Sequence, residues 1–244
     1  MLLGPARRLV QELRGRRVLR ALDVGTGVGS LLPDLREAFP LATVVGVDRS
    51  EGMLALAPRT ARLAIMDASR LALASESVDL VLLAFVLFHL PEPRRGLEEA
   101  RRVLRTGGAV GAVTWGSELV SRATRVWDEV LDARGARPLD FDTEVAQHEL
   151  VDTPEKMERL FRLAGFVDVR AWAEDHEHAI DLETLVRLRT SLGRNKRRYD
   201  SLEVGARGAF LAEARRRLAD LAAEDLEAIG RFVYTIAVAP RSGG

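Results

Sequence analysis

Three glycines interrupt the stretch Leu22-Asp23-Val24-Gly25-Thr26-Gly27-Val28-Gly29, which ends an apolar segment. Residues 18–24 predict a β-strand, and a helix is predicted from about Ser30 to Ala38. A glycine turn between a strand and a helix lets a ligand approach backbone that side chains would otherwise block. The helix end that follows offers unpaired N–H groups and the positive end of its dipole. The stretch therefore predicts a ligand-binding turn, with a tight turn that binds nothing as the alternative.

Strands and helices alternate on both sides of this stretch. Further strands are predicted at residues 43–47, 62–66, 78–84 and 109–114, and helices at 4–15, 50–56 and 93–104. The alternation predicts an α/β fold with a Rossmann-like, doubly wound, mostly parallel seven-stranded sheet. The near-continuous apolar strand at 78–84 fits the buried middle of such a sheet.

The alternation stops after Trp115. Helices are then predicted at residues 119–130, 154–165, 182–192 and 210–229, and two late strands at 166–173 and 232–239. We expect one domain spanning residues 1–244, with core motifs at 18–115 and helical insertions at about 116–153 and 180–230. An inserted amphipathic helix must bury its apolar face, so these insertions are expected to form a lid over the carboxyl edge of the sheet. A dimer interface is the alternative use of these helices.

Composition excludes several classes of protein. The 244 residues are 47% hydrophobic, which is enough to build one large core. Lys+Arg and Asp+Glu both number 36, and this zero net charge argues against a nucleic-acid partner. Cysteine is absent, so no thiolate nucleophile or Cys-based zinc site exists, and no bound metal is expected. The longest apolar run, residues 80–90, is too short to span a membrane, and a cytoplasmic location is expected.

The glycine spacing separates the classes of nucleotide-binding turn. The dinucleotide fingerprint is G-x-G-x-x-G/A, but here the third glycine comes one residue early, at Gly29, and Ser30 follows it. Asp48 ends the second predicted strand, a position suited to a ribose diol. Asp67 ends the third strand and could accept a hydrogen bond from an adenine amine, which a pyrophosphate-binding site does not require. The pattern therefore disfavours an NAD-dependent oxidoreductase.

Taken together, the motifs resemble those of class I S-adenosylmethionine-dependent methyltransferases. The resemblance is to the type 11 small-molecule branch, which includes quinone-biosynthesis and trans-aconitate methyltransferase-like enzymes. It rests on motifs in the right order at residues 18–29, 45–54, 66–68, 77–90, 100–108 and 164–166. It implies a bacterial-type enzyme that binds S-adenosyl-L-methionine, transfers the methyl group in line to a small-molecule acceptor, and releases S-adenosyl-L-homocysteine. The alternative is an S-adenosylmethionine-binding protein without turnover, such as a regulatory or accessory subunit.

The resemblance also implies roles for the residues at the first two strand ends. Gly25 and Gly27 would lie against the methionyl part of the cofactor, with Asp23 nearby. Asp48 would hold the ribose hydroxyls, and Met53 would pack on the adenine. Ordinary core packing is the alternative for this methionine, because Met readily fills gaps.

The remaining implied cofactor contacts come from the next two strand ends. Asp67 and Ala68 would bind the edge of the adenine, and a helix cap is the alternative role for this aspartate. Backbone around Ala84 and Phe85 would face the methionyl amine.

Methyl transfer demands little acid–base chemistry, because the sulfonium carbon is already electrophilic and transfer depends mainly on positioning. An oxygen acceptor would add a general base. His89 is the catalytic candidate, since it follows the fourth strand at the rim where this family binds acceptors; a structural histidine is the alternative. We expect His148, His176 and His178 to be surface residues.

Two further expectations concern the acceptor side of the site. Trp115 leaves the fifth strand and is a candidate wall of the acceptor pocket, with plain packing as the alternative. Few residues precede the first predicted strand, where relatives carry more helix that helps to close the cofactor site. The closing element is therefore expected from later segments or from a partner subunit, as in a homodimer.

Charge is uneven in the late part of the chain. Residues 142–183 carry 12 acids and 4 bases, whereas residues 184–217 carry 10 bases and 3 acids. The two stretches could be solvated faces that partly pair with each other. Alternatively, the basic run at 194–198 could bind an anionic acceptor or partner.

Overall fold

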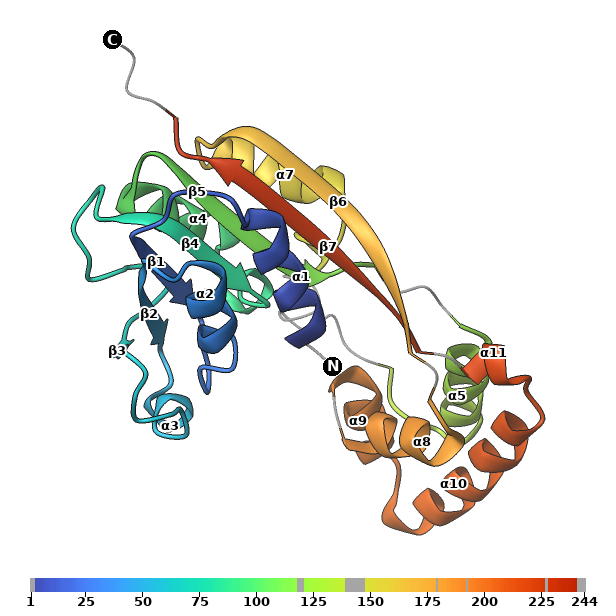
Figure 1. The fold of residues 1–244 in the computed structure, drawn as a ribbon. Coiled ribbons are helices and arrows are strands. Elements are labelled where there is room, and N and C mark those ends of the chain that lie inside the picture. Colours follow the sequence, from blue (N-terminus) through green and yellow to red (C-terminus); the bar gives the residue numbers. More distant parts are fainter. Residues whose placement is uncertain are drawn as a thin grey trace. The chain divides into compact units, whose positions relative to one another are not determined.

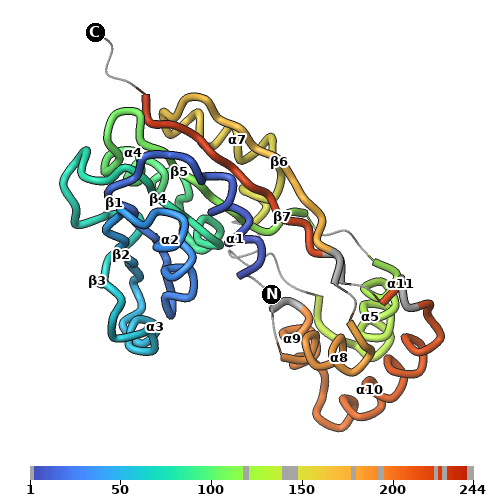
Figure 2. Tube along the Cα trace, in the orientation of Figure 1, coloured from blue at the N-terminus to red at the C-terminus, as the bar shows by residue number. Residues whose placement is uncertain are grey.

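The computed structural model describes residues 3–117, 121–138, 148–178, 180–191, 193–226 and 228–240. The chain forms two compact units. The first, called here the sheet unit, comprises residues 1–117, 144–174 and 232–244, and the second, the helical unit, comprises residues 118–143 and 175–231. Figures 1 and 2 show the course of the chain through both. Each unit is assembled from segments that are far apart in sequence, and a single domain over residues 1–244 stays a prediction.

In the described residues, seven strands form one sheet in the order β3-β2-β1-β4-β5-β7-β6 (Figure 1). The strands are β1 (Arg20–Val24), β2 (Thr43–Asp48), β3 (Leu63–Ile65), β4 (Val78–Ala84), β5 (Leu104–Trp115), β6 (Val167–His178) and β7 (Ala228–Val238). The first five strands pair in parallel, and β7 pairs antiparallel with β5. The predicted doubly wound, mostly parallel seven-stranded sheet is confirmed.

The order of the strands reverses direction at β1. From β1 the chain moves outward to β2 and β3, and it then returns to pair β4 with the other side of β1. Ligands of open α/β sheets bind at the carboxyl end of such a switch point, because the two neighbouring loops diverge there. The predicted site residues therefore follow the strands that flank this point.

Helices cover both faces of the sheet (Figure 1). The helices of the sheet unit are α1 (Leu3–Leu13), α2 (Leu32–Ala38), α3 (Glu51–Leu54), η1 (Leu87–His89, a 3-10 turn), α4 (Pro93–Val103) and α7 (Pro154–Leu163). Leu9 and Leu35 bring α1 and α2 into the core on one face of the sheet. Leu97 and Phe161 bring α4 and α7 into the core on the other face. The sheet is thus buried from both sides, as its continuous apolar strands require.

Local sequence accounts for the ends of these helices. Pro93 begins α4, where a missing backbone N–H has no cost. The hydroxyl of Thr153 accepts a hydrogen bond from the backbone N–H of Lys156 and caps α7. Gly165 has φ +86° just beyond the last turn of α7, which is the left-handed conformation that ends many helices.

The helical unit has its own apolar core. Its helices are α5 (Arg122–Ala133), α8 (Leu182–Ser191), α9 (Gly193–Asp200), α10 (Val204–Ala219) and α11 (Ala223–Leu226). Trp127 of α5 lies edge-on to Phe210 of α10, with 4.9 Å between the ring centroids, and both side chains are fully buried. The lid role of these helices, and the dimer interface that is its alternative, stay predictions. Of the helices in the described residues, none is long and apolar enough to cross a membrane.

The late strands and helices differ in extent from the sequence predictions. The helix predicted over residues 210–229 ends at Ala219, a separate turn forms α11, and β7 begins at Ala228. Residues 232–238 of β7 pair antiparallel with residues 109–115 of β5, within the late strand predicted at 232–239. The beginning of the helix predicted at 119–130 lies outside the described residues.

Gly107 and Gly108, which precede the strand predicted at 109–114, lie inside β5. The register of the β4–β5 pair shifts between Val78 and Leu80, so the glycines form an irregularity within the strand. The N–H of Gly107 donates to the carbonyl oxygen of Ala239, just beyond β7, and the N–H of Ala239 donates to the carbonyl oxygen of Gly108, which holds this irregular segment in the sheet.

The charged stretches pair within the chain. Arg215 binds Glu183 with nitrogen–oxygen distances of 2.9 and 3.0 Å, which joins the acidic and the basic stretch. Arg198 is 5% exposed and binds Asp128 and Asp132. The hypothesis of an anion site on the basic run is therefore wrong for Arg198, because its guanidinium is buried against two carboxylates.

Candidate functional site

The glycine loop after β1 has the backbone that its sequence predicts. Gly25, Gly27 and Gly29 have φ values of +71°, +57° and +75°. An L-residue with a side chain pays a steric penalty in this left-handed region, so the loop requires glycine at these positions. The loop leaves β1 at the switch point of the sheet, beside the end of β2.

The amides of this loop are satisfied within the protein. The N–H groups of Gly25 and Thr26 donate to the carbonyl oxygen of Val47, at 2.7 and 3.0 Å. The N–H of Gly27 donates to Oδ2 of Asp48 at 2.9 Å. The unpaired N–H groups that the sequence predicts belong to the helix end that follows, whereas these three amides of the turn are committed to protein oxygens. A pyrophosphate would need such amides free, so the loop suits a ligand that presents no phosphate to it.

Two close approaches bring the loop against other parts of the site. A Cβ built on Gly25 would lie 2.3 Å from Cγ2 of Val86, which follows β4. A Cβ built on Gly27 would lie 3.4 Å from Cε of Met53 on α3. Glycine at position 25 therefore lets the β1 loop and the exit of β4 converge, while Gly27 lies at ordinary contact distance from α3.

Asp23 is a buried carboxylate beneath the loop, with 2% of its surface exposed. Burial raises its pKa to about 6, opposed by a hydrogen bond from the Thr26 hydroxyl and assisted by the nearby charge of Asp48. That hydroxyl donates to Oδ2 of Asp23 at 2.7 Å. The Thr26 side chain packs on Gly46, where a Cβ would lie 2.7 Å from its Oγ1. Thr26 was not predicted; the isolated glycine in β2 is the sequence signal that marks this close approach.

The carboxylate of Asp48 accepts hydrogen bonds from two turns, the glycine loop after β1 and the turn that begins α3. Its second oxygen, Oδ1, accepts from the backbone N–H of Ser50 at 2.9 Å, and Ser50 in turn caps α3 by accepting from the N–H of Met53. The side chain of Met53 is 43% exposed, so the predicted alternative of plain core packing is not what the structure shows.

The end of β3 lies beside the end of β2. The backbone N–H of Met66 donates to the carbonyl oxygen of Asp48 at 3.0 Å, which places Asp67 and Ala68 at the same edge of the sheet. Asp67 is exposed and accepts from the N–H of Ser69 at 2.7 Å, as in a local Asx turn. Its carboxylate keeps further lone pairs for a ligand.

The exit of β4 carries backbone strain. Phe85 has φ +60°, an unusual value for a bulky residue, and its N–H is held by the carbonyl oxygen of Val113 at 2.8 Å. Strain of this kind persists only where the surroundings enforce it, and it clusters at functional sites. The ring of Phe85 lies 5.6 Å from that of Trp115 and 5.8 Å from that of Phe232, measured between centroids. Trp115 thus packs on Phe85 at the exit of β4. Its role as a wall of the acceptor pocket stays a prediction.

His89 ends η1 and is exposed. Its imidazole lies 4.2 Å from the ring of Phe88, and the ring of His148 lies 5.4 Å from the same phenyl ring. The prediction of His148 as a surface residue is wrong, because it is half-buried against this buried ring. His176 is half-buried as well, and the side chain of His178 lies outside the described residues.

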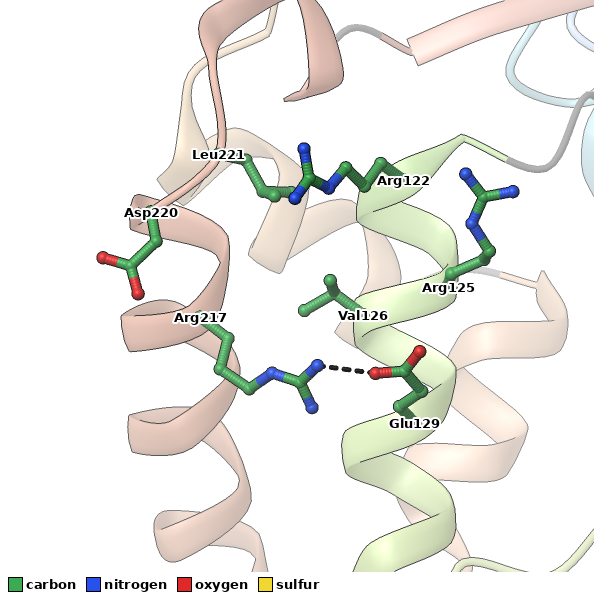
Figure 3. A pocket seen from close by; sticks show the side chains of 7 residues that line it. All are labelled: Arg122, Arg125, Val126, Glu129, Arg217, Asp220 and Leu221. Carbon is green, nitrogen blue, oxygen red and sulfur yellow. Dashed lines mark hydrogen bonds and ion pairs between the residues drawn. The ribbon is translucent and has the colours of Figure 1, made fainter.

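A hollow of about 400 Å³ lies in the helical unit between α5 and α10. Its lining residues are Arg122, Arg125, Val126, Glu129, Arg217, Asp220 and Leu221 (Figure 3). Arg217 reaches across it to Glu129, and Arg122 pairs with Asp225 at 3.4 Å. None of these residues is a predicted site residue, and the predicted ones lie instead at the converging strand ends of the sheet unit. Among the described residues, no group of three or more metal-ligating side chains is present.

The chain is similar in sequence to known proteins. A family profile described as "Methyltransferase domain" matches residues 22–111. A ubiquinone/menaquinone biosynthesis C-methyltransferase of Syntrophotalea carbinolica is 37% identical over 106 residues, 41% of this chain and 45% of that protein. A malonyl-[acyl-carrier protein] O-methyltransferase of Methylococcus capsulatus is 32% identical over 158 residues, 62% of this chain and 53% of that protein. The chain thus spans about half the length of these relatives.

A solved structure extends the similarity over nearly the whole chain. It is phosphoethanolamine N-methyltransferase 2 of Haemonchus contortus in complex with S-adenosyl-L-methionine. The TM-score is 0.55 at 19% identity, with 97% of this chain and 53% of that chain covered. At this identity the likeness supports the fold alone.

Proposed function

Because residues 22–111 form a methyltransferase domain of the type 11 branch of class I S-adenosylmethionine-dependent methyltransferases, we propose that the chain methylates a small-molecule acceptor. The observation that carries the proposal is the glycine loop. Its three left-handed glycines clear a surface beside Asp48 and Met53, while the amides of residues 25–27 are committed to protein oxygens. Such a loop fits a cofactor that lies on glycine backbone without offering it a phosphate.

The residues at the strand ends fit S-adenosylmethionine. Asp48 would bind the ribose hydroxyls, since each of its oxygens accepts one backbone hydrogen bond and keeps another lone pair. Met53 would lie on the adenine, with Asp67 and Ala68 at its edge. Asp23 would balance the positive charge of the methionyl end from beneath Gly25.

Acceptor chemistry would take place beyond the exit of β4. When bound, S-adenosylmethionine supplies an electrophilic methyl group, so the protein's main task is to hold the acceptor in line with it. The backbone carbonyls of Ala84 and Phe85 would accept hydrogen bonds from the methionyl amine. His89 is exposed at the rim and would take the proton of an oxygen acceptor.

The proposal also includes the acceptor class, the location, the oligomeric state and the lid that the sequence predicts. The balanced charge of 36 basic and 36 acidic residues supports a small molecule over nucleic acid as acceptor. A cytoplasmic location, a homodimer and a lid formed by the helical insertions belong to the proposal as well.

Calorimetry with S-adenosylhomocysteine, S-adenosylmethionine and NAD tests the cofactor assignment. We expect both sulfur compounds to bind and NAD to give no heat at the same concentrations. Binding of NAD without any response to the sulfur compounds would overturn the proposal. A methyl-transfer assay over a wide panel of acceptors then separates an enzyme from a binding protein without turnover.

Asp48→Ala is expected to weaken cofactor binding by about 1.5–3 kcal/mol, the scale of hydrogen bonds to a charged group. That is roughly tenfold or more in Kd, measured by calorimetry with S-adenosylhomocysteine. Glu37→Ala removes an exposed carboxylate from α2 of the same unit and serves as the control. Equal affinities for Asp48→Ala and the control would show that Asp48 does not bind the ribose.

A further inference from the structure

The segment of residues 148–152 is fixed against the exits of β4 and β5. The backbone N–H of Ser117, beyond β5, donates to the carbonyl oxygen of Asp152 at 2.9 Å. Val151 is fully buried and belongs to the core that contains Leu87 and Phe88. Residues 148–152 therefore lie at the carboxyl edge of the sheet, although they are distant in sequence from β4 and β5.

Lys156 fastens this segment from the first turn of α7. Its ammonium donates to the carbonyl oxygen of Glu149 at 2.6 Å and to Oδ1 of Asp152 at 2.7 Å. The N–H of Val151 donates to the carbonyl oxygen of His148 at 3.1 Å. The backbone that carries His148 is thus held at both ends of the turn.

The result is a cluster of three rings at the exit of β4. Phe88 is 8% exposed and contacts both imidazoles, with 4.2 Å between its centroid and that of His89 and 5.4 Å to that of His148. Its ring makes angles of 48° with His89 and 57° with His148, so all three rings are tilted against their neighbours. Tilted aromatic pairs of this kind favour one arrangement over its alternatives by roughly two- to tenfold each.

We propose that His148 is a positioning residue for His89: it packs on Phe88 and thereby fixes the ring on which His89 rests. The inference rests on the proposed function, because an imidazole held at the acceptor rim matters only if an acceptor binds there. An exposed side chain changes rotamer within picoseconds to nanoseconds. A general base, by contrast, must stay within about 2.6–3.2 Å of the proton that it takes. Packing on Phe88 restricts the rotamers of His89, and the contact of His148 with Phe88 restricts that ring in turn.

NMR of the histidine rings tests the proposal without an acceptor. In the unmodified chain the ring protons of His89 are expected to carry a ring-current shift from Phe88, because the two centroids are 4.2 Å apart. We expect His148→Ala to reduce that shift measurably, because Phe88 loses one of the rings that pack on it. His148→Phe keeps an aromatic ring at this position and is expected to restore the shift. His176→Ala, a substitution on β6, is the matched control and should leave His89 unchanged.

The outcomes distinguish the inference from the proposed function. Unchanged His89 resonances in a folded His148→Ala variant would overturn the positioning role. So would a His148→Phe variant that loses the shift as fully as the alanine variant does. If the substitutions behave as expected but S-adenosylhomocysteine does not bind, the contact stands and the proposed function fails.

Discussion

Gly25→Ala is expected to destabilise the chain by about 2–5 kcal/mol and to abolish measurable cofactor binding. The left-handed backbone at φ +71° costs an alanine about 1–2 kcal/mol. The new methyl would lie 2.3 Å from Cγ2 of Val86, and overpacking of this kind costs about 1–3 kcal/mol more. Either the loop or the exit of β4 must move, and both line the proposed cofactor site. Urea unfolding and calorimetry with S-adenosylhomocysteine measure the two effects.

A matched control separates backbone strain from the steric clash. Gly15 has φ +83°, and a Cβ built there meets no heavy atom within 4 Å. Gly15→Ala should therefore show the backbone cost alone and leave cofactor affinity unchanged.

A double substitution tests the clash directly. Val86→Ala removes the methyl group that Gly25→Ala would strike, so the double variant should be more stable than the sum of the two single effects. Strict additivity of the single effects would show that this contact does not govern the loop.

Asp23→Asn is expected to stabilise the protein by about 3 kcal/mol at pH 8 and by almost nothing at pH 4. Burial, more than the charge of Asp48, raises the pKa of Asp23 from 3.8 to about 6 in the folded state. The stability that the protonated form contributes is complete below about pH 4 and is lost as the pH rises through 6. A shift of about two pKa units corresponds to about 3 kcal/mol, which a neutral amide of similar volume recovers.

The measurement is urea unfolding of both proteins between pH 4 and pH 8. A stability difference that does not change with pH would contradict the buried, proton-linked role of Asp23. The same substitution should weaken S-adenosylmethionine binding, because the carboxylate that balances the methionyl charge is lost. Stability gained at the expense of binding is the pattern expected of a functional site.

Much of the core fold follows from local sequence. The strand at 78–84 was predicted with its observed bounds, because it begins a near-continuous apolar run of the kind that forms a buried strand. Ser50 and Thr153 cap helices as their positions before helical segments suggest. The helix predicted through residue 229 was wrong, because α10 ends at Ala219 and a separate turn, α11, precedes β7. The partner of β7 in the sheet, β5, is remote in sequence.

The sequence by itself determined which residue types follow each strand: glycines follow β1, an acid ends β2 and another acid follows β3. These are local properties, since left-handed backbone and strand termination depend on a few neighbouring residues. Only the tertiary structure decided how the groups act together. The burial that raises the pKa of Asp23, the contact between Gly25 and Val86, and the packing of His148 on Phe88 each join segments far apart in the chain. Sequence periodicity carries no information about such distances. They are set only when helices pack on both faces of the sheet and the loops meet at its carboxyl edge.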